Sequence, residues 1–355
     1  MKDEELPRTR HPDKRDRYAE AGRLPEIDRA KGIAILGVLL IHARPTADTW
    51  LHTYVVSQAV PVFLVLFGTT SELWWRRAGP GSAGRWYRTR AVRLLVPVWS
   101  ALAALWTFRF LAGVNTQSPL HVLLTFAGYM PWVGTGWFVT LALELVVLFP
   151  LIRWVVERIG AGAALAGAIA MLVWSEVHLE TVIALMQLVL HDTSARVSTA
   201  SYYYFWIFPP ARLFPVVAGM VLARRGMPSS RTGLTATALV VASSLVVDRL
   251  GPDPLLHRLA SWALCVPLTL AILAGVRHVG TGVGAALAWL GRHSWGVYLA
   301  QLVVHETIHG FASPDEASLG SRWAYFALLL ASAWLLVTVG ERLRDGVAAR
   351  PLPAA

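Results

Sequence analysis

The feature that most constrains this 355-residue chain is a series of apolar stretches, each about long enough to cross a membrane. A helix needs about 20 mostly apolar residues to span the hydrocarbon core. Short polar or basic segments separate the stretches that meet this requirement. Their approximate limits are 29–47, 51–73, 91–112, 137–153, 162–176, 201–222, 232–248, 258–276, 293–310 and 322–341. We therefore predict an all-α, polytopic membrane protein with about ten transmembrane helices.

The composition favours one membrane domain over a pair of soluble domains. Charged residues make up 15% of the chain, against about 25% in a typical soluble domain. Hydrophobic residues reach 55%, and 16 of the residues are tryptophans. A soluble fold of this composition would expose large apolar patches. The single cysteine, Cys265, excludes an intrachain disulfide and a cysteine-based metal cluster.

The basic residues predict how the helices are threaded through the membrane. With the amino terminus in the cytoplasm, the predicted inner segments hold 25 of the 32 lysines and arginines. This excess agrees with the positive-inside rule. The same threading places the carboxyl terminus in the cytoplasm and requires that 119–131 and 178–190 do not span. We expect a short outer or re-entrant helix over 119–131 and an outer excursion over 178–190.

The threading also predicts the domain limits. We expect a basic cytoplasmic tail over 1–28, a membrane domain over 29–345 and a short cytoplasmic tail over 346–355. The first of these segments has no apolar core. The net charge of +10 does not indicate nucleic-acid binding. A nucleic-acid surface needs clustered basic residues, whereas here they lie between apolar runs.

One histidine lies deep within the first predicted span. An ionisable side chain in the bilayer costs at least about 2.5–3.5 kcal/mol on insertion scales. His42 follows Lys31 by eleven residues, or about 16 Å at 1.5 Å per residue, which predicts a position near the midplane. It either packs against a neighbouring span through a hydrogen bond or stays neutral and accepts a proton in catalysis.

Two glutamates also fall within predicted spans. Glu144 is a second candidate catalytic residue, which could orient or charge-balance the imidazole. Alternatively, it pairs with an intramembrane arginine such as Arg109 or Arg212. Glu72 lies four residues before Arg76, and we interpret the two as an ordinary ion pair.

A basic segment leads directly into the third predicted span. Arg90 and Arg93 are spaced i, i+3, so both can lie on one helix face. If the helix begins here, its free backbone N–H groups would join the guanidinium groups in binding a phosphate. The alternative is a topology signal, since any inner loop of this kind is basic.

Two other functions remain open from the residues alone. His305, Glu306 and His309 match the zinc-protease pattern of two histidines one helical turn apart with an adjacent glutamate. A catalytic zinc needs a third protein ligand, and no later residue lies in a recognisable ligand motif, so we expect no metal. A transporter could use His42 and Glu144 to relay protons, but the inverted repeats typical of transporters are not visible.

Five segments, in order along the chain, resemble the integral-membrane acyltransferase-3 family, which acylates sugars and other surface molecules. The first span of that family has an aspartate, a basic residue three positions later and a histidine fourteen positions after the aspartate. Asp28, Lys31 and His42 have this spacing. The segments are IDRAKGIAILGVLLIH (27–42), PVFLVLFG (61–68), RTRAVRLLVPVW (88–99), GWFVTLALELVVLFPLI (136–152) and LGRHSWGVYLAQ (290–301).

The resemblance implies specific roles for these residues. His42 would be the catalytic base, and Asp28 and Lys31 would organise the inner mouth of the site. Contacts to the donor would come from Arg88, Arg90 and Arg93. The resemblance further implies an acyl-CoA donor, such as acetyl-CoA, and a hydroxyl of a carbohydrate or similar acceptor, at the plasma membrane.

The chain also departs from the family pattern. The second span has Phe67-Gly68-Thr69 in place of the usual Ser-Gly-Phe ending. Gln301 stands where many members carry a histidine. We therefore predict no catalytic role for that position.

Overall fold

The computed structural model describes residues 24–47, 49–79, 81–113, 119–130, 136–189, 201–249, 254–309 and 318–348. Every regular element in these ranges is a helix, which confirms the all-α prediction for them. The helices are α2 (Pro25–Ala43), α3 (Trp50–Tyr54), η1 (Val56–Gln58), α4 (Ala59–Ala78), α5 (Ala83–Leu111), α6 (Pro119–Phe126), α7 (Trp137–Ile159), α8 (Ala161–Val177), α9 (Leu179–Val189), α10 (Ser201–Trp206), η2 (Pro209–Arg212), α11 (Leu213–Arg225), α12 (Ser230–Arg249), α13 (Pro254–Gly275), α14 (Thr281–Arg292), α15 (Ser294–His309) and α16 (Leu319–Ala348).

Six helical segments of the described chain are long and apolar enough to cross a membrane. A seventh is obtained if α8 and α9, which meet at an angle of 86°, are counted as one broken span. The protein is therefore a multi-span membrane protein. The six segments are Trp50–Ala78, Ala83–Leu111, Trp137–Ile159, Ser230–Val247, Leu255–Gly275 and Leu319–Arg342.

Four of the ten predicted spans are helical but differ from a single long apolar helix. One is α8, which has 17 residues and reaches the length of a span only together with the bent α9; the other three differ for identifiable reasons. The first begins four residues earlier than expected, as α2, and therefore includes four charged residues near its amino terminus, from Glu26 to Lys31. The span predicted over 201–222 is divided into α10, η2 and the 13-residue α11. Pro209 and Pro210 lie at that break, where proline removes a helical donor. The third, α15, has 16 residues.

The two stretches that were excluded from the predicted spans also form separate helices. α6 is a helix of 8 residues within 119–131. α9 is a helix of 11 residues within 178–190, and it bends sharply away from α8. Both are shorter than the hydrocarbon core requires of a spanning helix.

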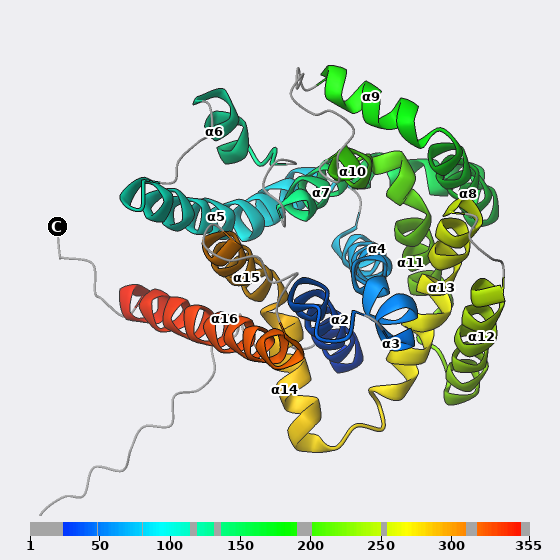
Figure 1. Ribbon diagram of the computed structural model, residues 1–355. Helices are drawn as coiled ribbons and strands as arrows, with labels where there is room; N and C mark the ends of the chain where they lie inside the picture. The colour runs from blue at the N-terminus through cyan, green and yellow to red at the C-terminus, as the bar shows by residue number, and fades with distance from the viewer. Residues whose placement is uncertain are drawn as a thin grey trace, which may run out of the picture.

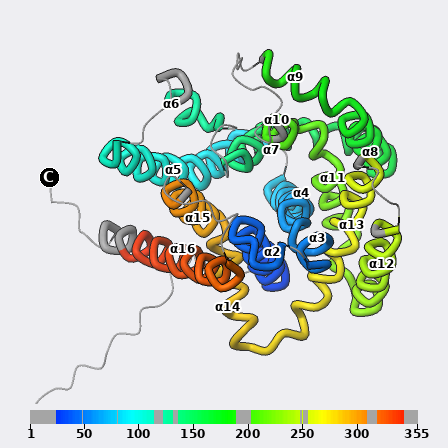
Figure 2. Tube along the Cα trace, viewed as in Figure 1, coloured from blue at the N-terminus to red at the C-terminus, as the bar shows by residue number. Residues whose placement is uncertain are grey.

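Helix α2 lies inside the bundle, with α3 and α4 on one side and α15 and α16 on the other (Figures 1 and 2). Its closest neighbour is α14, and glycines allow their backbones to touch. A Cβ on Gly291 would collide with the carbonyl of Asp28, and one on Gly32 would collide with the carbonyl of Leu287. Small residues at helix contacts are typical of membrane proteins, because they permit close approach.

A second close contact joins α4 and α11. A Cβ on Gly68 would meet the carbonyl of Val216, and one on Gly219 would meet the carbonyl of Val65. The hydroxyl of Thr69 donates a hydrogen bond to the Gly219 carbonyl across the contact, at 3.0 Å. Thr69, which follows Gly68, therefore adds a hydrogen bond to the close contact between α4 and α11.

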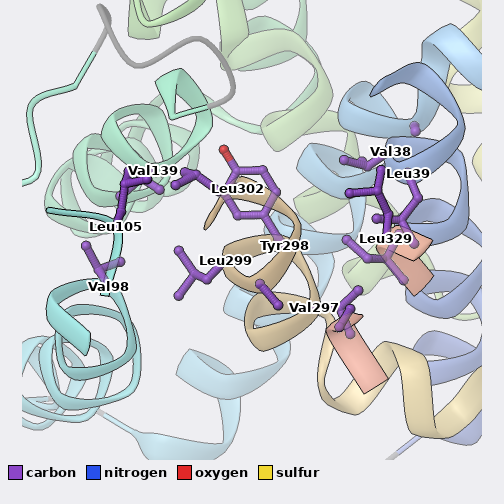
Figure 3. Close-up of a cluster of buried hydrophobic side chains, with 14 of the residues drawn as sticks. Val38, Leu39, Val98, Leu105, Val139, Val297, Tyr298, Leu299, Leu302 and Leu329 are labelled. Atoms are coloured by element: carbon purple, nitrogen blue, oxygen red, sulfur yellow. The ribbon is translucent and has the colours of Figure 1, made fainter. Parts of the chain in front are cut away.

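Helix α15 is central to the largest buried apolar cluster. Figure 3 shows its side chains between α2 and α16 on one side and α5 and α7 on the other. Within this cluster Val297, Tyr298 and Leu302 are at most 4% exposed. By contrast, α5 exposes large apolar side chains such as Val92, Val96 and Phe110. Apolar surface of this kind is stable against lipid and not against water.

Candidate active site

His42 lies in the last turn of α2, where its ring faces a second histidine. The rings of His42 and His305 have centroids 5.1 Å apart and planes inclined by 58°. His42 is half-buried and His305 is 8% exposed. Two imidazoles from α2 and α15 thus meet at the end of the bundle where α2 finishes.

Polar groups from two further helices surround this pair. The Nδ1 atom of His305 and the hydroxyl of Tyr325, on α16, share a hydrogen bond of 2.7 Å. The next residue along α15, Glu306, accepts a hydrogen bond of 3.0 Å from Arg109 near the end of α5. The side chains of Arg109 and Glu306 are 17% and 11% exposed. Four helices therefore supply an ordered polar cluster, which we call the histidine cluster (His42, His305, Tyr325, Glu306 and Arg109).

Asp28 and Lys31 lie at the other end of α2. The Asp28 carbonyl touches Gly291 and Gly32 touches the Leu287 carbonyl, so α14 runs against α2 at this end. Helix α15 begins directly after α14, at the same end, and its His305 meets His42, so α15 runs in the same direction as α2. Asp28 and His42 are fourteen residues apart, or about 21 Å along a helix. The structure therefore separates the predicted inner-mouth residues from the predicted base by most of a membrane core.

The predicted donor arginines lie at the Asp28 end. The indole N–H of Trp295, at the start of α15, donates to the carbonyl of Leu94 at 3.3 Å. Because α5 runs from there to Arg109, its arginine segment and the histidine cluster lie at opposite ends. Arg88 and Arg93 are exposed, and the guanidinium of Arg90 lies 4.5 Å from the centroid of the Trp86 ring.

One part of the arginine prediction is wrong. Helix α5 begins at Ala83, not beside Arg90 and Arg93. The backbone N–H groups at Arg90 and Arg93 are therefore inside the helix, where they already donate to preceding carbonyls. A phosphate at these arginines would be bound by guanidinium groups without the help of a helix amino terminus.

Glu144 lies on α7 and is bonded to a tyrosine. The hydroxyl of Tyr129 donates a hydrogen bond to its carboxylate at 3.2 Å. Burial raises the pKa of the Tyr129 phenol, and the charge of Glu144 adds to this effect, so the phenol remains a donor. The alternative pairing of Glu144 with Arg109 or Arg212 is wrong, since Arg109 bonds Glu306 and Arg212 packs over the Phe205 and Trp262 rings. A catalytic role for Glu144 stays a prediction.

The expected ion pair between Glu72 and Arg76 is also wrong. Glu72 is 2% exposed and pairs with Arg224 at 2.9 Å and with Arg153 at 3.3 Å. Arg76 instead donates to the carbonyl of Ala223 at 3.2 Å. Glu72 therefore links three helices, α4, α7 and α11, rather than one turn of its own helix.

The side chains of the zinc-protease pattern have other partners. His305 is hydrogen-bonded to Tyr325, and Glu306 is paired with Arg109. The side chain of His309 lies outside the described residues. Within the described part of the chain, no three His, Cys, Asp or Glu side chains gather as a metal site would require.

Sequence reasoning missed most of the histidine cluster. In the sequence, His305 and Glu306 fit only the zinc-protease pattern, and no motif includes Tyr325. His305 follows Gly291 by the same fourteen residues that separate Asp28 from His42, but α14 ends and α15 begins between them, so this spacing does not predict the contact of the two histidines.

Comparison with known proteins identifies the family. No curated protein and no solved structure matches the chain. The sequence model of the acyltransferase-3 family, described as an acyltransferase domain, matches residues 24–340. The match extends from α2 into α16 and includes both ends of the candidate site. The chain therefore belongs to the acyltransferase-3 family of integral-membrane acyltransferases.

Proposed function

We propose that this protein is an O-acyltransferase that moves a short acyl group from acyl-CoA to a hydroxyl group of a carbohydrate or a similar acceptor. The donor is acetyl-CoA or another short acyl-CoA. The protein acts in the plasma membrane, through ten spans with both termini in the cytoplasm. No metal is needed for this chemistry.

The observation that carries the proposal is the separation of two kinds of polar residues along α2. Asp28 and Lys31 lie at one end, on the side of the basic α5 segment, and His42 lies in the histidine cluster at the other end. Cationic guanidinium groups suit the phosphates of CoA. An imidazole suits proton transfer from a hydroxyl group near neutral pH.

The donor and the acceptor would meet at His42 from opposite sides. Arg88 and Arg93, which are exposed, hold the CoA phosphates at the cytoplasmic face, with Arg90 between them. The pantetheine arm extends from there along the bundle and brings the thioester toward His42. The acceptor approaches from the outer side, where α2, α5 and α15 end.

The transfer step balances without a further reactant. The acceptor hydroxyl oxygen attacks the thioester carbonyl carbon, and its proton passes to the neutral imidazole of His42. The carbonyl electron pair moves onto oxygen in the tetrahedral intermediate. As that pair returns, the C–S bond breaks and the departing CoA sulfur takes the proton from the imidazolium. The products are the acyl ester and free CoA.

Membranes containing the protein, incubated with acetyl-CoA labelled in the acetyl group, test the proposal. We expect the label to appear in an ester-linked, alkali-labile product that membranes without the protein do not form. Label recovered only as free acetate, or equal labelling in both preparations, contradicts the proposed transfer.

A further inference from the structure

Gln301 on α15 is a fully buried polar side chain. It is 0% exposed, and neither atom of its amide has a hydrogen-bond partner among the residues that the structure describes. An unpaired buried amide lowers the stability of the folded state. Buried polar groups without partners are rare in native proteins, and a functional role is one established reason for them.

The position of Gln301 relates it to the histidine cluster. It precedes His305 by four residues, which is one helical turn, about 6 Å along the axis and 40° around it. The two side chains therefore leave α15 on the same face. Gln301 therefore lies on α15 one turn before the residue that meets His42, on the side toward the start of the helix, where Trp295 bonds the Leu94 carbonyl.

Gln301 also lies on the side of the histidine cluster from which the donor would arrive. The proposed donor arginines are at the Asp28 end of the bundle, and Gln301 is one turn nearer to that end than His305. On the proposed route, a thioester that comes from the cytoplasmic face reaches the level of Gln301 before the level of His42.

We propose that the Gln301 amide N–H donates a hydrogen bond to the carbonyl oxygen of the acyl group as that oxygen becomes negatively charged. This inference rests on the proposed acyl transfer and adds the group that stabilises its oxyanion. A side-chain amide held in a dry environment suits this role, because it needs little reorganisation when the charge develops. The partner that the amide lacks in the folded protein is then the substrate oxygen.

The test is the substitution Gln301→Met, which keeps the length of the side chain and removes the donor. We expect kcat to fall by about 10²–10³, the usual effect of losing one oxyanion donor, with the KM for acyl-CoA little changed. We also expect Q301M to unfold at a higher temperature than the wild type, because an unpaired buried amide has been removed.

Gln58→Met is the matched control. Gln58 is also buried, at 3% exposed, and its amide oxygen likewise has no partner among the described residues, but its amide nitrogen donates to the Ser261 hydroxyl at 2.7 Å. We expect Q58M to lower the unfolding temperature and to leave kcat of the folded protein unchanged. A higher unfolding temperature for Q301M together with a lower one for Q58M would show that the Gln301 amide does not stabilise the fold, whereas the Gln58 amide does.

The outcomes distinguish this proposal from the proposed function. A wild type that transfers no acyl group overturns both. An active wild type with a fully active Q301M overturns the role of Gln301 alone. A Q301M protein that loses activity and unfolds at a lower temperature shows that the amide is structural, and this also overturns the proposal.

Discussion

At the scale of single residues, the site depends on two imidazoles in contact. The rings of His42 and His305 lie 5.1 Å apart, and two positive charges at that distance in a half-buried site would repel each other. The Tyr325 hydroxyl, hydrogen-bonded to His305 at 2.7 Å, fixes the orientation of the second ring.

Replacing Tyr325 with phenylalanine tests this positioning role. The variant keeps the ring and removes the hydroxyl that orients His305, so we expect kcat to fall about tenfold, equivalent to one hydrogen bond of about 1.4 kcal/mol. The KM for acyl-CoA should not change, because the donor arginines lie at the other end. Steady-state kinetics with acetyl-CoA give both values.

Tyr87→Phe is the control for Tyr325→Phe. It removes a comparable hydrogen bond, from the Tyr87 hydroxyl to the Val147 carbonyl at 2.9 Å, at the opposite end of α5. Equal losses of kcat in the two variants would indicate a general effect of weakened packing and would contradict the positioning role.

The residues at each end of α2 could be predicted from the sequence, whereas the histidine cluster could not. Asp28, Lys31 and His42 lie within one helix, and helical spacing alone relates them. His42 and His305 are far apart in the chain, and their contact depends on which helices are neighbours. A pattern within one segment does not contain that information, and for this reason the pairing expected for Glu72 and the alternative pairing of Glu144 are both wrong.

At the scale of helices, the register of α2 depends on glycines. Gly291 and Gly32 let α14 and α2 touch backbone to backbone. This contact sets the height of Asp28 relative to Gly291, and through α15 it sets the height of His42 relative to His305. The close approach of two helices thus aligns the histidine pair.

Gly291→Ala should disturb this alignment. The added Cβ would collide with the Asp28 carbonyl, which belongs to the backbone and cannot rotate away. We expect a loss of about 1–3 kcal/mol in the free energy of unfolding, as for other overpacked contacts. Thermal unfolding of the purified variant measures this loss.

Gly282→Ala, on the same helix, is its matched control. A Cβ at Gly282 meets nothing within contact distance, and alanine is a better helix former than glycine by up to about 1 kcal/mol. This variant should be as stable as the wild type or more so. If G291A were as stable as G282A, the backbone contact would not determine the packing of α2 and α14.

Helix type was easier to predict than helix limits. Apolar runs of about 20 residues predict helices, and the described chain contains only helices as regular elements. The limits differ where a local signal acts inside a run, as at Pro209 and Pro210. They also differ where a polar segment is helical, as at the start of α5, because helix formation does not require apolar residues.

At the scale of the whole molecule, α5 is long enough to extend from one face of the membrane to the other. Its 29 residues measure about 43 Å at 1.5 Å per residue, which exceeds the hydrocarbon core of about 30 Å. Its basic residues cluster near one end, and Arg109, which pairs with Glu306, lies near the other. The proposed function requires the first end to be cytoplasmic.

Single cysteines test this orientation. Cys265 is the single cysteine of the chain and is 0% exposed. A Cys265→Ala background therefore contains no thiol that could react with a maleimide. Gly84 and Ala112 are exposed at opposite ends of α5. With a membrane-impermeant maleimide, we expect Ala112→Cys to react in intact cells and Gly84→Cys to react only after permeabilisation. The reverse pattern would place the arginines outside and contradict the direction of donor approach.

The measurement that tests the central claim most directly is acyl transfer by His42→Ala, compared with the wild type and with His278→Ala, an exposed histidine far from the cluster. We predict that H42A loses transfer by at least about 10²-fold, as removal of a general base would cause, while its unfolding temperature and its membrane insertion match those of H278A. H278A should be fully active. Normal transfer by a folded H42A would contradict the assignment of His42 as the base on which the proposed mechanism depends.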